Sequence, residues 1–382
     1  MPVLLTERER DIFLKAKEFS VRYLAPEAAQ WEADRKLPDK VRKLLQDHGF
    51  FGVGAPVEVG GKGCNYLETA LTYEGLAYGD GGVAFFIQLH NNIAFEIATF
   101  YDTTDKVKAL TPDMIKGNKL TCFALTEKSG GSDPTMTEAS AELKEDGYHV
   151  FGHKDWASDS LDADYFTVIV KDGTAKGMVM LLLEKGMPGF TIAEDRQRIG
   201  GNAMSCGTLH FDDVVVPREN LLSVDGFKEA LKAIDVARVF VPAIAVGVAQ
   251  RALDITADHL ARRVTFGQPI LKNQAVQWQL AELTALVQAA RWTVYHTASL
   301  KDSGERVSTQ AAVNKLFVPN AVLKVTLECA QLFGAEGCAW NSEITRCVNL
   351  ARIFKVVDGT IEVQKIVIAR GIEKDAFARI AQ

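Results

Sequence analysis

The chain has 382 residues, of which 47% are hydrophobic and 24% charged, which is the composition of an ordinary globular protein. This length is sufficient for two or three domains with a sizeable core. The formal net charge of −6 argues against a nucleic-acid-binding protein, which normally has a basic excess. The N-terminal residues show no basic segment followed by an apolar one, and the apolar run 178–183 is too short to span a bilayer. We therefore expect a cytoplasmic protein without membrane or nucleic-acid partners.

Cysteine and histidine spacing gives no indication of a metal site. The six cysteines form no CxxC pair and no zinc-like spacing, so we interpret them as buried free thiols. His149 and His153 lie four residues apart, which would place them on one face of a helix. Gly152 and the alternation around it instead favour a strand and turn, so no metal ligand is predicted.

The expected elements divide the chain into three parts. Residues 1–118 are predicted to be helical, beginning with a capping box formed by Thr6 and Glu9. Residues 119–224 contain short runs rich in β-branched and aromatic residues separated by turns, which is typical of a small antiparallel sheet or barrel.

Residues 225–382 are again predicted to be helical, in a four-helix block. Pro319 is expected to kink a long helix there. An apolar stripe with alternating steps of four and three residues indicates a helix within a bundle: Val276, Leu280, Leu283, Val287, Ala290 and Val294. The predicted fold is mainly α with a central β domain.

Three segments carry motifs in a fixed order. They are 123–133 (FALTEKSGGSD), 156–158 (WAS), and a C-terminal set consisting of 263–267 (RVTFG), Gln274, 331–334 (QLFG) and 358–360 (DGT). Together they resemble the acyl-CoA dehydrogenase family over essentially the whole chain. The resemblance implies an N-terminal helical domain, a middle antiparallel β-barrel, a C-terminal four-helix bundle and an FAD cofactor.

Asp358 is the predicted catalytic base. An isolated Asp-Gly is more commonly a surface or capping pair, but this one lies between Val356-Val357 and Ile361, an apolar setting that would raise the pKa of a carboxylate. In the family, the residue at this place removes the proton alpha to a thioester. The family's alternative place for the base, just before an arginine, is Ala237 here. Asp358 is therefore the candidate that the pattern leaves.

The resemblance also assigns the flavin-binding residues. Leu125 and Thr126 would meet the edge of the flavin, and the small residues 130–132 allow close approach to a phosphate. Taken alone, Trp156 could equally be a core aromatic, and its distance from Thr126 along the chain favours the flavin. Around the same flavin the resemblance places Phe123, Gly131, Ser132, Ser158, Thr360 and Glu362.

A second set resembles the residues that contact the FAD of a neighbouring subunit. Arg263 corresponds to an arginine that meets the pyrophosphate, to which a guanidinium offers a charge-assisted, bidentate match. The other members of this set are Thr265, Phe266, Gln274, Gln331 and Gly334. This arrangement implies a homotetramer built as a dimer of dimers.

The shorter base shapes the expected substrate. The family usually has Glu where this chain has Asp358, and Asp occurs in branches that act on alicyclic acyl-CoAs such as cyclohexanecarboxyl-CoA. Val357 and Glu362 also depart from the family's usual Tyr and Gln. We therefore expect an alicyclic or α-branched acyl-CoA. The predicted substrate contacts are Ser132, Asn91, Arg238 and Gly359, although Asn91 and His90 are open to a second interpretation as buried, satisfied core residues.

Two alternatives remain open at this point. A nitroalkane-oxidase-like enzyme would share the fold and the Asp base without using CoA, and Arg238 argues against it because CoA-using members have an arginine there. A flavin-bearing relative that binds DNA is disfavoured by the acidic balance and by the presence of a base. For the dehydrogenase, the resemblance implies an electron-transferring flavoprotein as the electron acceptor.

Overall fold

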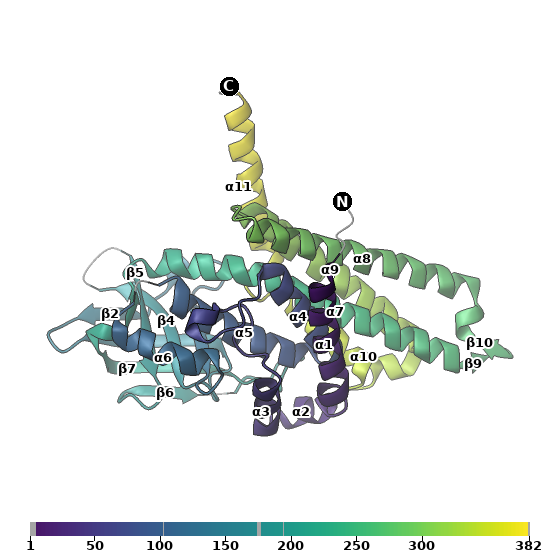
Figure 1. Cartoon of the computed structure of the whole chain (residues 1–382), viewed down its shortest axis with the longest axis horizontal. Helices are drawn as coiled ribbons and strands as arrows, with labels where there is room; N and C mark the ends of the chain where they lie inside the picture. Colours follow the sequence, from purple (N-terminus) through teal and green to yellow (C-terminus); the bar gives the residue numbers. More distant parts are fainter. Residues whose placement is uncertain (1–4, 102, 174–176, 194, 381–382) are drawn as a thin grey trace.

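The computed structural model describes residues 5–101, 103–173, 177–193 and 195–380. A β-sheet domain lies at one end of the molecule, and long C-terminal helices reach the other end (Figure 1). The N-terminal helices pack between and against these two parts, and the last helix, α11, extends away from the body. The predicted fold class, helical with a central β domain, is confirmed.

Helix α4 of the N-terminal part packs against the long C-terminal helix α7 (Gly226–Arg262). The capping box predicted at the first helix is present, because Glu9 N–H donates to Thr6 Oγ1 at 3.2 Å and Thr6 N–H donates to the Glu9 carboxylate at 2.6 Å. Gly247 of α7 lets this helix approach α4 closely, since a Cβ at position 247 would lie 2.3 Å from the carbonyl oxygen of Glu74. The helices are α1 (Glu7–Phe19), α2 (Ala28–Asp34), α3 (Asp39–Asp47), α4 (Tyr66–Gly79), α5 (Gly81–Thr99) and α6 (Asp105–Ile115).

The middle of the chain forms a sheet in the order β6-β7-β3-β2-β4-β5-β8, with β1 paired to β4. Most pairs are antiparallel as predicted, but β4 pairs in parallel with both β1 and β2. β1 is the first strand after the N-terminal helices. The strands are β1 (Thr121–Ala124), β2 (Ser140–Leu143), β3 (Tyr148–Ser158), β4 (Tyr165–Asp172), β5 (Met178–Glu184), β6 (Phe190–Ala193), β7 (Cys206–Val216) and β8 (Leu221–Ser223).

The C-terminal helices form a bundle against α4 and α5. Of the predicted apolar stripe, Leu283, Val287, Ala290 and Val294 are buried, while Val276 and Leu280 are half-buried. A short hairpin of β9 (Val264–Thr265) and β10 (Gln268–Pro269) lies at the end of the bundle far from the sheet (Figure 1). The helices are α7 (Gly226–Arg262), α8 (Gln274–Asp302), α9 (Ser308–Leu332), α10 (Glu343–Ile353) and α11 (Ile361–Ile380).

Two prolines lie inside these helices. Pro319 lies within α9, which continues through it. Pro242 lies within α7 and has no N–H to give to the carbonyl oxygen of Arg238, four residues earlier. That oxygen instead accepts from Asn314 Nδ2 of α9 at 3.2 Å. The backbone defect is therefore satisfied by a neighbouring helix, which joins α7 to α9.

A buried ion pair holds the segment that follows β1. The side chains of Lys154 and Glu127 are both 0% exposed, and Lys154 Nζ lies 2.6 Å from Glu127 Oε1. The ammonium also donates to the carbonyl oxygen of Leu125 at 3.1 Å and to Thr137 Oγ1 at 2.7 Å. Glu127 additionally accepts from the N–H of Glu138 at 2.5 Å. This network fixes the backbone of Leu125 relative to β3.

Lys154→Met should lower the free energy of unfolding by about 3–5 kcal/mol, because it leaves the Glu127 carboxylate buried without its countercharge. Urea unfolding followed by fluorescence measures the change. The control is Lys144→Met, whose lysine lies on the same domain in an exposed pair and should change stability by less than about 0.5 kcal/mol. Equal losses in the two variants would show that the buried pair is not what stabilises this segment.

Candidate active site

Asp358 lies in the loop between α10 and α11, in a backbone conformation that the surrounding helices hold in place. Its φ is 53° and that of Gly359 is 91°, so both residues occupy the left-handed region. Arg238 Nε of α7 donates to the carbonyl oxygen of Asp358 at 3.2 Å, and Gln364 Nε2 of α11 donates to that of Gly359 at 2.9 Å. Lys315 Nζ of α9 donates to the carbonyl oxygens of Phe354 at 2.7 Å and Gly359 at 3.4 Å. Side chains from three helices thus hold the Asp358 loop, residues 354–360.

The electrostatic setting of Asp358 suits a general base. Burial raises the pKa of its carboxyl group, while the positive charges of Lys315 and Arg238 act in the opposite direction. Burial in turn lowers the pKa of Lys315 to about 8. Arg238 is itself held by Asp235 Oδ1 at 2.9 Å. A carboxylate with a raised pKa, kept near two cations, is the kind of group that enzymes use to remove protons.

The sequence interpretation missed Lys315 and Gln364. Lys315 is fully buried on α9, on the same face as the apolar Ala311, Ala312 and Val322. A lysine within an apolar helical stripe could have indicated a buried polar contact from the sequence alone, because a buried ammonium group needs a hydrogen-bond partner. Gln364 is also fully buried, but one polar residue on the first turns of a helix gave no such signal.

The residues predicted to meet the flavin edge lie together. Asp155 N–H donates to the carbonyl oxygen of Thr126 at 2.8 Å, which places Trp156 beside Thr126. Trp156 lies where the pairing of β3 with β7 shifts register, has a φ of 57° and leaves 52% of its surface exposed. Such an irregularity re-aims a side chain. The guanidinium of Arg196 lies 5.0 Å from the Trp156 ring centroid.

These residues fit a flavin. The exposed indole of Trp156 offers a stacking surface, and the Thr126 hydroxyl makes no hydrogen bond to another described residue, so it is available to a ligand. Ser158 is half-buried at the end of β3, and Phe123 is half-buried on β1. Gly131 and Ser132 are exposed in the loop after Thr126. Thr360 Oγ1 accepts from Val363 N–H at 3.4 Å as the first turn of α11 begins, and Glu362 is exposed.

The second predicted set lies elsewhere in the chain. Arg263 directly follows the end of α7. Phe266 is fully exposed at the tip of the β9–β10 hairpin, and this hairpin lies far from the sheet (Figure 1). The His259 and Phe333 rings stack at 4.4 Å and hold the end of α9 against α7. Thr265 is half-buried, and Arg263, Gln274, Gln331 and Gly334 are exposed. The fold of one chain therefore brings this set together but keeps it apart from Trp156 and Thr126.

Two predicted substrate contacts have structural partners. Asn91 is buried, accepts from Gly52 N–H at 2.8 Å and donates to the carbonyl oxygen of Phe50 at 2.9 Å. His90 Nε2 contacts the carbonyl oxygen of Met114 at 2.7 Å, and burial lowers the pKa of its ring to about 4. These bonds support the interpretation as satisfied core residues. Arg238 is likewise buried, and it contacts the Asp358 loop.

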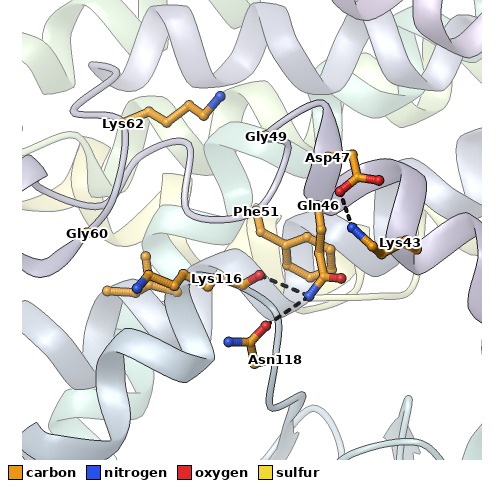
Figure 2. Close-up of a pocket in the computed structure, with 10 residues that line it drawn as sticks. Lys43, Gln46, Asp47, Gly49, Phe51, Gly60, Lys62, Lys116 and Asn118 are labelled. Carbon is orange, nitrogen blue, oxygen red and sulfur yellow. Dashed lines mark hydrogen bonds and ion pairs between the residues drawn. The ribbon is translucent and has the colours of Figure 1, made fainter.

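A surface cavity of about 350 Å³ lies between the ends of α3 and α6 and the loop that precedes α4 (Figure 2). Gln46 Nε2 donates across its floor to the carbonyl oxygen of Lys116 at 3.2 Å, and Lys43 pairs with Asp47. None of the predicted site residues lines this cavity.

Among the described residues no group of His, Cys, Asp or Glu is placed to hold a metal ion. Across the same residues, every helix is too short or too polar to cross a bilayer.

The three parts of the chain match family models in order. The match is to the acyl-CoA dehydrogenase N-terminal domain over residues 6–118, the middle domain over 122–214 and the C-terminal domain over 224–373. A helical domain, a sheet and a bundle, with the Asp358 loop held by side chains of α7, α9 and α11, are the features of a flavoprotein dehydrogenase fold. The chain belongs to the acyl-CoA dehydrogenase family.

Individual relatives agree with this assignment. The short-chain specific acyl-CoA dehydrogenase of Clostridium acetobutylicum is 29% identical over 370 residues, 96% of this chain and 98% of that protein. A chain from structural work on the electron transferring flavoprotein of Acidaminococcus fermentans has a TM-score of 0.93 and 31% identity, covering 97% of this chain and 99% of that one. The glutaryl-CoA dehydrogenase of Mycobacterium smegmatis in complex with FADH2 has a TM-score of 0.92 and 25% identity, covering 97% and 95%.

Lys315→Met should move the acid limb of the pH profile of flavin reduction to higher pH, because removing the Lys315 charge raises the pKa of Asp358 further. It should also cost about 1–3 kcal/mol of stability, since the carbonyl oxygen of Phe354 loses its donor. Stopped-flow reduction from pH 5 to 9 and urea unfolding measure the two effects. Lys324→Met, on an exposed position of the same helix, should change neither. A stability loss without a shift of the profile would leave Lys315 a purely structural role.

Proposed function

We propose that this protein is an FAD-dependent acyl-CoA dehydrogenase that desaturates the Cα–Cβ bond of an acyl-CoA thioester, with Asp358 as the base that removes the α proton. The observation that carries the proposal is the Asp358 loop, whose backbone carbonyl oxygens accept hydrogen bonds from Lys315, Arg238 and Gln364. Burial raises the pKa of the Asp358 carboxyl group within this loop. The relatives support the substrate class, because they are named for short-chain acyl-CoA and glutaryl-CoA.

FAD, when bound, supplies the acceptor for the hydride that leaves the β carbon. The residues of this chain remove the α proton and bind the thioester carbonyl. Asp358 must be ionised to take the α proton, and the charges of Lys315 and Arg238 favour that ionised form. Within the described part of the chain, the N–H groups of Asp358 and Gly359 have no hydrogen-bond acceptor. They are therefore available to a thioester carbonyl oxygen, on which negative charge develops as the proton leaves.

The substrate is proposed to be alicyclic or α-branched, with cyclohexanecarboxyl-CoA as the reference compound. The support is the identity of the base. Asp is one methylene shorter than Glu, so the α carbon must come closer to the loop or meet the carboxylate at another angle. The positive φ of Asp358 favours a short side chain at this position, since Asp and Asn are enriched in the left-handed region.

The FAD site is proposed to be shared between subunits of a homotetramer. The separation of the Trp156 set from the Arg263 set supports this, because one cofactor could contact both only if the second set came from a neighbouring chain (Figure 1). Exposed apolar side chains on the C-terminal helices, including Trp278 and Trp292 at 62% and 61% exposure, provide surface for such contacts. An electron-transferring flavoprotein is the proposed acceptor, in keeping with the Acidaminococcus fermentans structure.

Asp358→Asn should retain FAD and lose flavin bleaching by cyclohexanecarboxyl-CoA by at least about a thousandfold, because an amide cannot take the α proton. Anaerobic absorbance at the flavin band measures this. The control is Asp375→Asn on the exposed part of α11, which should bleach as the wild type does. Rapid flavin bleaching in the Asp358→Asn variant would remove Asp358 from the mechanism.

The substrate class is tested with the wild-type protein. A preference for butyryl-CoA or octanoyl-CoA would refute the alicyclic substrate, and flavin bleaching only by a nitroalkane would refute the CoA assignment.

Arg263→Ala should weaken FAD retention at least about tenfold, because it removes a charge-assisted contact with the pyrophosphate. Fluorescence titration of the apoprotein measures the affinity, and sedimentation velocity reports the assembly. Arg262→Ala is the matched control, since its neighbouring arginine is also exposed at the end of α7. Equal affinities for the two variants would argue against a cofactor contact at Arg263.

A further inference from the structure

Glu96 of α5 is a buried carboxyl group that the proposed mechanism does not use. It is 3% exposed. Its Oε2 accepts from the hydroxyl of Tyr101 at 3.2 Å, while its Oε1 is buried and has no hydrogen-bond partner among the described residues. A buried polar atom without a partner costs about 1–3 kcal/mol, so its retention needs an explanation.

The surroundings of Glu96 favour its neutral form. Burial, assisted by the charges of Asp358 and Glu229, raises the pKa of its carboxyl group to about 8, and the bond from Tyr101 opposes this only in part. A neutral carboxyl group has one O–H donor. Since Oε2 accepts from Tyr101 and Oε1 has no partner among the described residues, we assign the proton to Oε1. Glu96 therefore presents an unused hydrogen-bond donor.

The position of this donor is set by what packs beside it. Ile93 and Ile97, which flank Glu96 on α5, belong to the same apolar cluster as Leu125 at the flavin edge and Ala230 of α7. Asp358 is near enough for its charge to act on Glu96. The Glu96 donor thus lies in the layer between the segment that follows β1 and the Asp358 loop. Under the proposed function, an acyl group held between the base and the flavin would extend toward that layer.

We propose that Glu96 is a specificity residue, whose carboxylic acid donates a hydrogen bond from Oε1 to an oxygen atom carried by the acyl group beyond its β carbon. The substrate class is then an acyl-CoA whose chain or ring bears a hydroxyl or carbonyl oxygen. This inference rests on the proposed function and narrows it. A site that offers a buried donor discriminates against the analogue that lacks the acceptor, because the donor is then left unpaired.

The test compares matched thioesters with and without the oxygen: 4-hydroxycyclohexanecarboxyl-CoA against cyclohexanecarboxyl-CoA, and 4-hydroxybutyryl-CoA against butyryl-CoA. For the wild type, kcat/KM for anaerobic flavin bleaching should be at least about tenfold higher for the oxygen-bearing member of one pair. Glu96→Met, which has similar volume and no donor, should bring that ratio close to one. Glu96→Gln retains a donor and should keep most of the preference.

Binding provides a readout that does not depend on turnover. In Asp358→Asn, the Kd of each thioester, measured by perturbation of the flavin spectrum, should show the same preference, and adding Glu96→Met should abolish it. Thr167→Val is the control, because it removes another buried hydroxyl without a partner on β4 and should leave the ratio unchanged.

The outcomes separate the two proposals. Ratios within about threefold of one in the wild type for both pairs, or an unchanged ratio in Glu96→Met, would overturn the role of Glu96 while bleaching by thioesters upholds the dehydrogenase. A wild-type protein whose flavin no thioester perturbs or reduces would overturn the proposed function, and the specificity role with it.

Discussion

The chemistry proposed for this protein depends on a carboxylate that is desolvated and yet kept ionisable. Burial favours the protonated form of Asp358, and full exposure would make it a weaker base. The structure reconciles these demands with Lys315 and Arg238, two cations brought in on separate helices. Because both also donate to backbone carbonyl groups of the Asp358 loop, the contacts that tune the base are the contacts that position it.

Charged side chains that also bind the backbone are found in the β domain as well. Lys154 and Glu127 form a buried pair whose members also bind the backbone of Leu125 and of residues 138–139. The segment beside Trp156 is therefore fixed from within the sheet. Around Asp358 and around Thr126 alike, irregular backbone is made rigid by buried ionic groups rather than by regular secondary structure. Rigid placement of this kind is what a site for hydride and proton transfer needs.

Much of the architecture could be read from the sequence, because it follows from local patterns. The capping box of Thr6 and Glu9 and the stripe through Leu283 and Val287 depend on residues close in the chain. The parallel pairing of β1 with β4 could not be predicted, since it joins strands that β2 and β3 separate in the chain. Motifs led to Asp358, Thr126 and Trp156, but not to Lys315, Gln364 or Glu96, whose roles come from contacts between distant segments. Asn91 and Arg238 show the converse: residue type for Asn91 and the family resemblance for Arg238 suggested a substrate contact, and tertiary contacts gave each a partner within the protein.

Pro242 and Asn314 have a consequence for how sequences of this fold can diverge. The missing N–H of Pro242 leaves the carbonyl oxygen of Arg238 to be satisfied by Asn314, the residue just before Lys315. A relative with any other residue at position 242 would close the normal hydrogen bond within the helix, and an amide at 314 would then be buried without its acceptor. The two positions should therefore covary across an alignment, with proline accompanied by a side-chain donor and its absence accompanied by a small apolar residue.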